Sequence, residues 1–411
     1  MEGIADMGRR WVGVLMVGLV VMGIGVGCGT AAPTGAPPTG TPEVTLTPTM
    51  APTRTPRPTA TESAIPAALA ERAAALGRGV NLGNALEAPN EGEWGMVIEP
   101  EFFPLIRDAG FDTIRVPIRW SAHAAETAPY TVDTAFFERV DWVIDQGLAN
   151  DLNVVINMHH YDPLFEDPED HYDRFIAIWT QIATRYADRP DALYFELLNE
   201  PHGNLDAKRW NGLMARTIEA VRAIDDGHTL VLDGADWGGI NGLNGLVFPE
   251  GASNFIATFH FYDPMLFTHQ AAEWVGPEYG TLGVTWPGPP DVAVTPLPEA
   301  REVEWVRLWF MRYNQTPGSS NPASVDAIGQ AFDRALAWSE ARGVPLWLGE
   351  FGAYQTADMA SRARWTATVR AEAEARGFPW AYWEFGAGFG VYDREAAAWR
   401  TPLLEALVPA P

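Results

Sequence analysis

The sequence predicts an α/β protein whose eight strands close into a (β/α)8 barrel, the TIM barrel architecture. From residue 79 onward, short apolar or β-branched runs alternate with amphipathic helical stretches, the pattern of repeated βα units with a parallel sheet. Eight such runs fit into about 330 residues, which matches a barrel with insertions. Polar residues gather at the carboxyl ends of these runs, where a barrel places its active site.

Each strand of the expected barrel is followed by a helix or a loop. We expect strands at 79–82, 113–118, 153–157, 192–197, 229–232, 256–260, 346–349 and 380–383. We expect helices at 101–109, 134–148, 172–186, 207–224, 323–341 and 360–375. The segment after the fifth strand, 238–247, has a weak helical pattern. A doubly wound open sheet is the main alternative for such βα repeats.

A long connection, 263–322, follows the sixth strand and is rich in Trp, Pro and Gly. Loops of this size in a compact barrel are usually functional or disordered. We expect its first part, 267–274, to lie near the cleft. The insertion at 280–322 lies beside the active site in the predicted barrel, so we expect it to influence substrate binding.

The N-terminus has the order of an export signal. Arg9 and Arg10 precede an apolar run, 11–26, which is short for a membrane-spanning helix of about 20 residues. The run leads to Cys28 in a sequence similar to a bacterial lipoprotein cleavage site, although Gly25 stands where that site usually has Leu. Lipidation of Cys28, cleavage with release and an uncleaved membrane anchor remain open. Each of them would export the protein.

The next segment, 29–63, consists mainly of Pro, Thr, Ala and Gly with repeated Thr-Pro steps. It cannot bury enough apolar surface to offset its ordering entropy, so we expect a disordered linker. The chain then divides into a signal peptide or lipoprotein signal at 1–28, a Pro/Thr-rich linker at 29–63 and a catalytic barrel at 64–411.

Composition excludes several classes of partner. The 411 residues carry a formal net charge of −25, which disfavours binding to nucleic acid or to anionic membrane surfaces. A single cysteine allows no intrachain disulfide. We expect a monomer without a cofactor or a metal ion.

Two glutamates stand at the ends of the fourth and seventh predicted strands. Glu200 lies in the sequence LLNEP and Glu350 in LGEFG. Taken singly, each could be a surface charge or lie beside a helix N-cap. Together they would face each other across the barrel mouth, as glycoside hydrolysis requires: one carboxyl protonates the leaving oxygen while the other, ionised, meets the oxocarbenium-like centre.

Seven motifs in order resemble glycoside hydrolase family 5, the cellulase-type endoglucanases. They are GVNLGNALEAP at 79–89, IRVPIRW at 114–120, NMHHY at 157–161, ELLNEPH at 196–202, HFY at 260–262, LGEFG at 348–352 and AYWEF at 381–385. The likeness extends over 76–407, nearly the whole predicted barrel. A chance match to all seven in sequence is not credible.

This resemblance implies a retaining double displacement with Glu350 as nucleophile and Glu200 as acid/base. Their carboxyl groups should then lie about 5 to 5.5 Å apart, not the roughly 6.5 to 9.5 Å of an inverting pair. It implies that Arg115 keeps Glu350 ionised, that Tyr262 donates a hydrogen bond near it, and that His260 helps to set the protonation of Glu200.

The resemblance also implies which residues hold the sugar. Asn199 would bond the 2-hydroxyl of the sugar under attack, His159 would lie alongside it, and Trp383 would form its stacking floor. Further sugars on the non-reducing side would contact residues similar to those of the closest relatives: Asn84, Glu87, His160 and Trp274.

Glucan is the first expectation for the substrate, and dual activity on glucan and mannan is the second. The catalytic motifs do not separate these polymers, since mannan differs from glucan in the 2-hydroxyl that Asn199 and His159 address. A silent carbohydrate-binding barrel is disfavoured because it would not need both glutamates together with their supporting residues. A metal pair at His159 and His160 is disfavoured because no third ligand has suitable spacing and neighbouring strand residues point to opposite faces.

Overall fold

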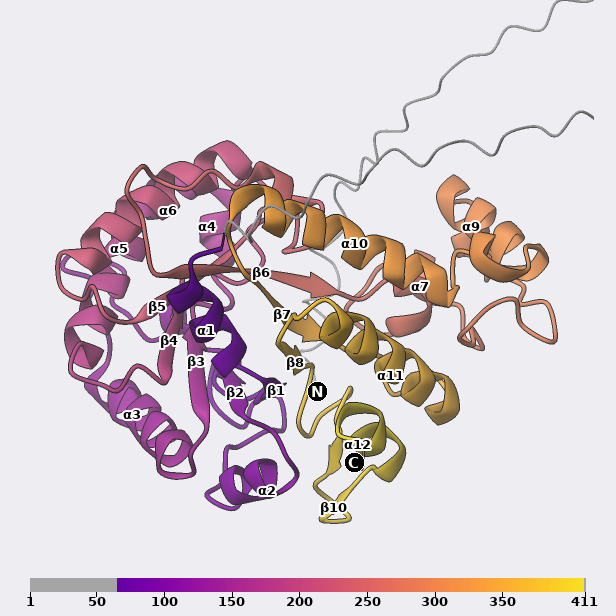
Figure 1. Ribbon diagram of the computed structural model, residues 1–411, viewed down its shortest axis with the longest axis horizontal. Helices are drawn as coiled ribbons and strands as arrows, with labels where there is room; N and C mark the ends of the chain where they lie inside the picture. Colours follow the sequence, from indigo (N-terminus) through magenta and orange to yellow (C-terminus); the bar gives the residue numbers. More distant parts are fainter. Residues whose placement is uncertain (1–64, 410–411) are drawn as a thin grey trace, which may run out of the picture. The chain divides into compact units, whose positions relative to one another are not determined.

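The computed structural model describes residues 65–409, which form a closed barrel of eight parallel strands (Figure 1). The predicted signal segment with Cys28 and the predicted linker lie outside the described residues. Within 65–409, no helix is both long enough and apolar enough to cross a membrane. The barrel prediction is confirmed, and the open-sheet alternative is excluded because β1 pairs with both β2 and β8.

The strands agree with the predicted runs to within two residues at either end. They are β1 (Arg78–Asn81), β2 (Thr113–Val116), β3 (Asn153–Asn157), β4 (Leu193–Glu196), β5 (Thr229–Asp233), β6 (Phe255–Phe261), β7 (Leu346–Phe351) and β8 (Trp380–Tyr382). The second strand ends before Pro117, which has no N–H to donate to a neighbouring strand. The sequence expectation had carried this strand on to residue 118.

Six long helices surround the barrel at the predicted places. They are α2 (Phe102–Asp108), α3 (Thr134–Ala149), α5 (Pro168–Tyr186), α6 (Ala207–Arg222), α10 (Val325–Arg342) and α11 (Met359–Ala375). Helix α5 begins four residues before the expected 172, because Pro168 suits the first turn of a helix. After β5 the structure has only the short 3-10 helix η3 (Gly242–Gly245), in agreement with the weak helical pattern there.

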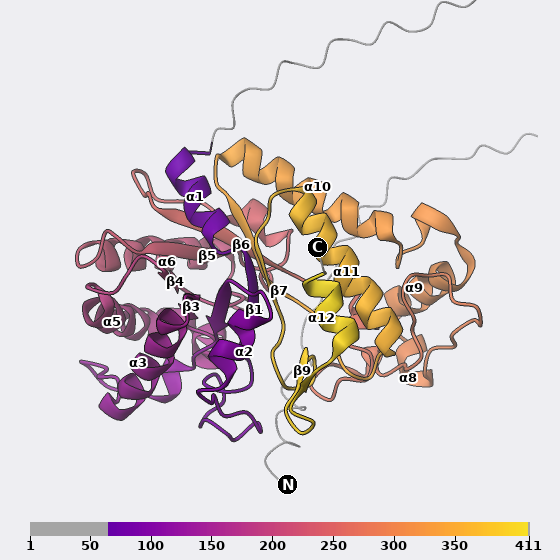
Figure 2. The same ribbon diagram turned by 60° about the horizontal axis from the view of Figure 1, so that its bottom comes forward.

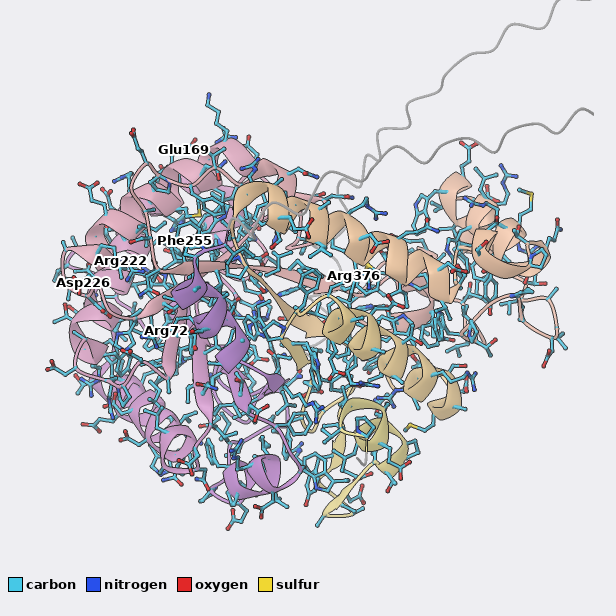
Figure 3. The ribbon with its side chains drawn as sticks, in the orientation of Figure 1. Arg72, Glu169, Arg222, Asp226, Phe255 and Arg376 are labelled. Carbon is cyan, nitrogen blue, oxygen red and sulfur yellow. The ribbon has the colours of Figure 1, made fainter. Side chains whose placement is uncertain are left out.

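Polar side chains at helix ends and between helices fix the outer ring. Arg376, at the end of α11, lies 2.6 Å from Asp333 of α10 (Figure 3). Arg222, the last residue of α6, donates to the carbonyl oxygens of His228 and Asn254, each at 2.9 Å. These contacts hold the turns that lead into β5 and β6.

Helix α1 (Ala67–Ala75), which the sequence reading did not predict, closes the amino-terminal end of the barrel. Figure 1 shows it across the middle of the strands. Tyr194, near the start of β4, donates its hydroxyl to the carbonyl oxygen of Arg72 at 2.9 Å. A small apolar cluster joins the helix to the strands; its members are Ala73, Leu76, Val155, Tyr194, Val231, Ile256, Trp347 and Ala381.

A polar layer lies directly above this apolar one inside the barrel. Side chains two positions apart on a strand point the same way. The residues two positions beyond the apolar layer, or at the same height on β1 and β2, are buried and polar; they are Asn81, Arg115, Asn157, Glu196, Asp233 and Thr258. The side chains at the barrel mouth therefore rest on hydrogen-bonding groups and not on an apolar core.

The insertion after β6 forms short elements at the side of the barrel. They are α7 (Met265–Thr268), η4 (Pro277–Tyr279), α8 (Pro298–Arg301), α9 (Glu304–Gln315) and η5 (Gly318–Ser320). Figures 1 and 2 show α9 standing out from the ring beside α10 and α11. The buried Trp286 ties the insertion to α11: its N–H donates to Ser361 at 3.1 Å and its carbonyl accepts from Arg364 at 2.8 Å.

The remaining elements are small and lie around the mouth and the chain end. They are η2 (Trp120–Ala122), α4 (Asp162–Glu166), the hairpin of β9 (Tyr392–Asp393) and β10 (Ala398–Trp399), and α12 (Thr401–Leu407). The sequence reading had predicted none of them.

Candidate active site

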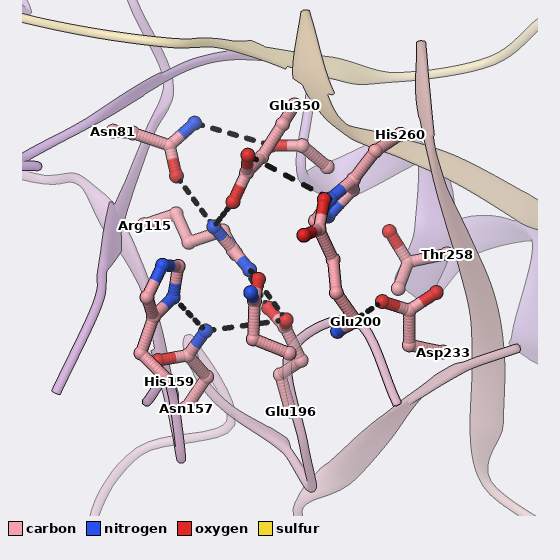
Figure 4. A network of polar contacts seen from close by, with 12 residues as sticks. Asn81, Arg115, Asn157, His159, Glu196, Glu200, Asp233, Thr258, His260 and Glu350 are labelled. Carbon is pink, nitrogen blue, oxygen red and sulfur yellow. Dashed lines mark hydrogen bonds and ion pairs between the residues drawn. The ribbon is translucent and has the colours of Figure 1, made fainter. Parts of the chain in front are cut away.

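The two glutamates predicted to be catalytic meet at the carboxyl-terminal mouth of the barrel (Figure 4). Glu200 follows β4, and Glu350 is the fifth residue of β7. One oxygen from each carboxyl group and one ring nitrogen of His260 lie within 4.8 Å of one another. The two carboxyl groups therefore face the same small space at the barrel mouth.

Arg115 of β2 lies beneath this pair and uses all five of its N–H donors. Two go to Glu196, at 2.6 Å each, and one goes to Glu350 at 2.5 Å. The remaining two go to the side-chain oxygens of Asn81, at 2.9 Å, and Asn199, at 2.7 Å. The predicted contact with Glu350 is present, but Glu196 shares the guanidinium, which the sequence reading missed.

Glu350 is buried and held by partners at both oxygens. Oε1 accepts from Arg115, and Oε2 accepts the hydroxyl of Tyr262 at 2.8 Å. Burial raises the pKa of Glu350, while the charge of Arg115 and the hydrogen bond from Tyr262 oppose that rise. These partners favour the ionised form of the group that the prediction assigns as nucleophile.

Glu200 has different surroundings. Its side chain is 23% exposed to the mouth, and burial of the remainder raises its pKa to about 7. Nδ1 of His260 and Oε1 of Glu200 are joined by a hydrogen bond of 2.7 Å. Burial lowers the pKa of His260 to about 4, so this ring is neutral at neutral pH and puts no positive charge beside Glu200.

Three further predicted residues line the same space. Nδ2 of Asn157 lies 3.1 Å from Nδ1 of His159, and burial lowers the pKa of His159 well below its usual value. With Nδ1 accepting from Asn157, the proton of the neutral ring is on Nε2, which leaves a donor for a ligand. The ring of His159 stacks on Trp383 at 5.6 Å between centroids and 6° between planes. Asn199 is fixed by its bond to Arg115.

The outer predicted sugar-binding residues divide into two groups. Trp274 is 44% exposed and packs edge-on against Tyr354 at 4.8 Å, and His160 lies edge-on to Trp94 at 5.6 Å. Glu87 is buried instead, and its carboxylate accepts the backbone N–H groups of Asn84 and Ala85. Its sugar-binding role stays a prediction.

The polar layer under the mouth supplies functional candidates that the sequence reading missed. Asn81, Asn157, Glu196 and Asp233 all contact a predicted site residue or its backbone. Their i, i+2 spacing from inward-facing apolar residues was the available signal, since a polar residue in that position on a barrel strand points into the interior.

Trp237 is another residue that the sequence reading missed. It is 39% exposed, and its ring stacks on His202 at 3.5 Å. Nδ1 of His202 lies 2.6 Å from the carbonyl oxygen of Glu200. A partly exposed aromatic ring is therefore linked through His202 to the backbone of Glu200, and Trp274 lies beside His269, whose ring packs edge-on against Tyr262.

Glu200, His260 and Glu350 also come close enough together to hold a metal ion. Arg115 already places a positive charge on Glu350, and a divalent cation bound there would be repelled by it. His159 and His160 are set edge-on, at 86° between their planes.

The barrel is closed, and its mouth holds one carboxyl group with a pKa of about 7 and a second that accepts hydrogen bonds at both oxygens. This combination is typical of glycoside hydrolases. The family model Cellulase (glycosyl hydrolase family 5) matches residues 76–388. The chain belongs to glycosyl hydrolase family 5.

Curated relatives carry the same domain within longer chains. Endoglucanase H of Acetivibrio thermocellus is 31% identical over 344 residues, which cover 82% of this chain and 33% of that protein. Cellulase/esterase CelE of the same organism is 26% identical and covers 80% of this chain and 39% of that protein. The chain therefore spans between a third and two fifths of the length of these relatives.

Three solved structures match over all or nearly all of their own chains. Cel5A of Thermotoga maritima in complex with cellobiose is 44% identical with a TM-score of 0.72, covering 83% of this chain and 100% of that one. The same values hold for Cel5A in complex with a mannotriose substrate. The cellulose synthase subunit Z of Clostridioides difficile is 32% identical with a TM-score of 0.70, covering 81% of this chain and 99% of that one.

Proposed function

We propose that this protein is a retaining endo-β-1,4-glucanase with Glu350 as nucleophile and Glu200 as acid/base. The observation that carries the proposal is that two carboxyl groups, with oxygens within 4.8 Å of each other, have different hydrogen-bond donors and different neighbouring charges. Glu350 has a cationic and a neutral donor on its two oxygens, whereas Glu200 has a pKa of about 7 and a neutral histidine beside it. Retaining hydrolysis needs this division of duties.

In the first step, Glu350 attacks the anomeric carbon while the bond to the leaving oxygen breaks. Glu200 gives its proton to that oxygen, and a covalent glycosyl ester forms on Glu350. In the second step, Glu200, now ionised, takes a proton from a water molecule. The water oxygen attacks the anomeric carbon, releases Glu350 and restores the proton on Glu200, so the product has the configuration of the substrate.

Supporting residues surround the place where the sugar under attack would lie. His159 presents Nε2 as a donor, Asn199 is locked by Arg115, and Trp383 offers an aromatic face. Arg115 and Tyr262 stay on Glu350 through both steps and favour its departure as a carboxylate.

Internal cleavage is supported by two exposed aromatic residues in the surroundings of the pair. Trp274 is 44% exposed and contacts His269, which packs on Tyr262, and Trp237 is 39% exposed and stacks on His202 next to the backbone of Glu200. Aromatic rings stack on the apolar faces of sugars in the same way as they pack on other flat apolar surfaces. A polymer held on both sides of the scissile bond is cut within its length.

Dual activity on glucan and mannan is a second candidate function. Its support is the likeness to Cel5A of Thermotoga maritima, which has been solved in complex with cellobiose and with a mannotriose substrate. In this chain, the choice between the two polymers would fall to His159 and Asn199, because the sugars differ at the 2-hydroxyl.

Export belongs to the same proposal. A polymeric substrate cannot enter a cell, and the charged and apolar order of 1–28 suits an export signal. Attachment through lipidated Cys28, release after cleavage and an uncleaved anchor remain the three forms of it. Mass spectrometry of the N-terminal peptide of the mature protein distinguishes these three alternatives.

The test is hydrolysis of carboxymethylcellulose, barley β-glucan and glucomannan by the full chain, with Glu350→Gln and Glu200→Gln as matched variants. We expect activity on the glucans that falls by roughly 10²-fold or more in each variant, the scale of a lost acid/base group or beyond. The first product, followed by NMR, should have the β configuration. An α product would contradict the retaining mechanism, and inactivity on all three polymers would contradict the glucanase proposal.

A further inference from the structure

Asp233, the last residue of β5, is fully buried in the polar layer below Glu200 (Figure 4). Its Oδ2 accepts the backbone N–H of Glu200 at 2.8 Å, and its Oδ1 accepts the N–H of Gly234 at 2.8 Å. Both oxygens are therefore occupied by backbone donors. No part of the side chain reaches the mouth, so Asp233 does not touch the sugar.

The backbone of Glu200 needs this support. Its φ is +47°, in the left-handed region that residues other than glycine seldom occupy. Strand β4 ended four residues earlier, at Glu196, so no strand partner takes the N–H of Glu200. A buried N–H without an acceptor is costly, and the carboxylate of Asp233 removes that cost only while Glu200 keeps its left-handed conformation. This conformation directs the side chain of Glu200 into the mouth.

The same carboxylate supports the turn that lies under His260. Asp236, Trp237 and Gly238 have successive positive φ values of 69°, 60° and 62°. A Cβ on Gly238 would lie 2.6 Å from Oδ2 of Asp233, so the turn packs directly on the carboxylate. The carbonyl oxygen of Gly238 accepts the backbone N–H of His260 at 2.8 Å.

From this geometry we infer that Asp233 is a positioning residue for the proton donor, and the inference rests on the proposed function. It holds the backbone of Glu200 directly and the backbone of His260 through Gly238. These two side chains meet at the 2.7 Å hydrogen bond that sets where the proton of Glu200 lies. Asp233 thus acts first on the acid/base; Glu350 takes its hydrogen bonds from Arg115 and Tyr262, and Nδ1 of His260 lies 3.6 Å from its Oε2.

A second buried aspartate offers a matched control. Asp225 lies shortly before Thr229, the first residue of β5. It also accepts two backbone N–H groups, those of Gly227 at 2.9 Å and His228 at 3.1 Å. It lies at the amino-terminal end of the barrel, away from the mouth. Its Oδ2 also lies 2.5 Å from Nδ1 of His228, so Asp225→Asn removes a buried backbone acceptor together with a histidine contact, at the end of β5 opposite to Asp233.

The experiment compares two substrates that differ in their need for a proton donor. A 2,4-dinitrophenyl β-cellobioside has a leaving group that departs without protonation, whereas the alcohol released from barley β-glucan requires it. For Asp233→Asn, we expect kcat/KM on β-glucan to fall by roughly 10²-fold, the scale of general acid catalysis, and kcat/KM on the aryl substrate to change by less than about threefold. Asp225→Asn should leave the ratio of the two values unchanged.

Azide gives a second readout. It attacks the glycosyl ester on Glu350 without needing a base, so it accelerates turnover of the aryl substrate only where the base function of Glu200 is impaired. We expect azide to raise kcat of Asp233→Asn, with β-cellobiosyl azide as product, and to leave wild type and Asp225→Asn unaffected.

A proportional loss on both substrates, or no loss, would overturn the inference. If Asp233→Asn does not fold, Gly238→Ala approaches the same carboxylate from the turn and should give the same selective loss. Wild type tests the proposed function separately, because a wild-type protein inactive on both substrates contradicts that function whatever the variants do.

Discussion

Arg115 links the reacting pair to the buried layer beneath it. Its five donors reach two carboxylates and two amide oxygens, and the two carboxylates raise its pKa against the opposing effect of burial. A lysine at this position has three donors on one nitrogen and cannot reproduce the planar fork. Glu196 in particular would be left in a fully buried place with fewer hydrogen-bond donors.

For Arg115→Lys we expect a loss of about 3 to 5 kcal/mol in the free energy of unfolding, the scale for breaking a buried ion pair. Urea denaturation measures it. Arg216→Lys is the control: Arg216 and its partner Asp173 are both exposed, so its replacement should cost no more than about 1 kcal/mol. Equal stability of the two variants would contradict the importance assigned to the buried network.

Sequence reasoning found the polar residues that stand out from the predicted apolar runs. It missed Asn81, Asn157, Glu196 and Asp233, which are the last residues of β1, β3, β4 and β5. Glu200, His260 and Glu350 stand out because polar residues interrupt apolar runs at one predictable end of a barrel strand. Glu196 and Asp233 lie inside or at the edge of apolar runs, and each required knowledge of which face of its strand points inward. That knowledge comes from the register of the closed barrel, which no single strand contains.

At the scale of elements, the strands and the six helices that follow them were predictable, whereas the helices α1 and α9 were not. A barrel strand is a short apolar run whatever its neighbours are. Helix α1 has a narrow apolar face, with Leu69 and Ala73 packed on the strand interior, and it is needed only because the barrel has an open lower end. Helix α9 likewise packs on other parts of the insertion, such as α8 and Thr285, and its own sequence does not indicate them.

Leu76→Ala tests whether the lower end of the barrel is independent of its mouth. Leu76 is fully buried between α1 and the strands, and its truncation should cost about 2 to 5 kcal/mol. Because the polar layer lies between this cluster and the carboxyl pair, we expect kcat at 25 °C to remain within about twofold of wild type. Thermal unfolding and β-glucan hydrolysis measure the two effects.

The half-buried Leu69 gives the comparison for that variant. Leu69→Ala removes the same atoms from the same helix and should lower stability by a smaller amount. A fall in kcat that tracks the loss of stability across both variants would show that the lower cluster does influence the site.

For the molecule as a whole, buried titratable groups set how stability varies with pH. Burial raises the pKa of Glu87 to about 8 and those of Glu200 and Glu384 to about 7, from 4.5. Their contribution is fully present below pH 4.5 and is lost as the pH rises through 7 and 8. Burial lowers the pKa of four histidines from 6.5 to about 4; they are His160, His202, His260 and His269. Their contribution is present above pH 6.5 and is lost as the pH falls toward 4.

The two sets act in opposite directions, so we expect the melting temperature to be highest near about pH 6 and to fall on either side. Calorimetry between pH 4.5 and 9 measures this. Glu87→Gln should flatten the alkaline side of the curve, whereas Glu71→Gln, at an exposed position of α1, should leave it unchanged. A melting temperature that rises between pH 7 and 9 would contradict the expectation.

The position of α1 also decides how the enzyme can be attached to a support. Helix α1 closes the amino-terminal end of the barrel, and the carboxyl pair opens at the opposite end. A polymer lying across the mouth therefore lies at the end of the barrel opposite to α1. Coupling through an exposed side chain of α1, such as Glu71, would leave the cleft facing solvent and open to long chains, even when the attached surface is densely covered.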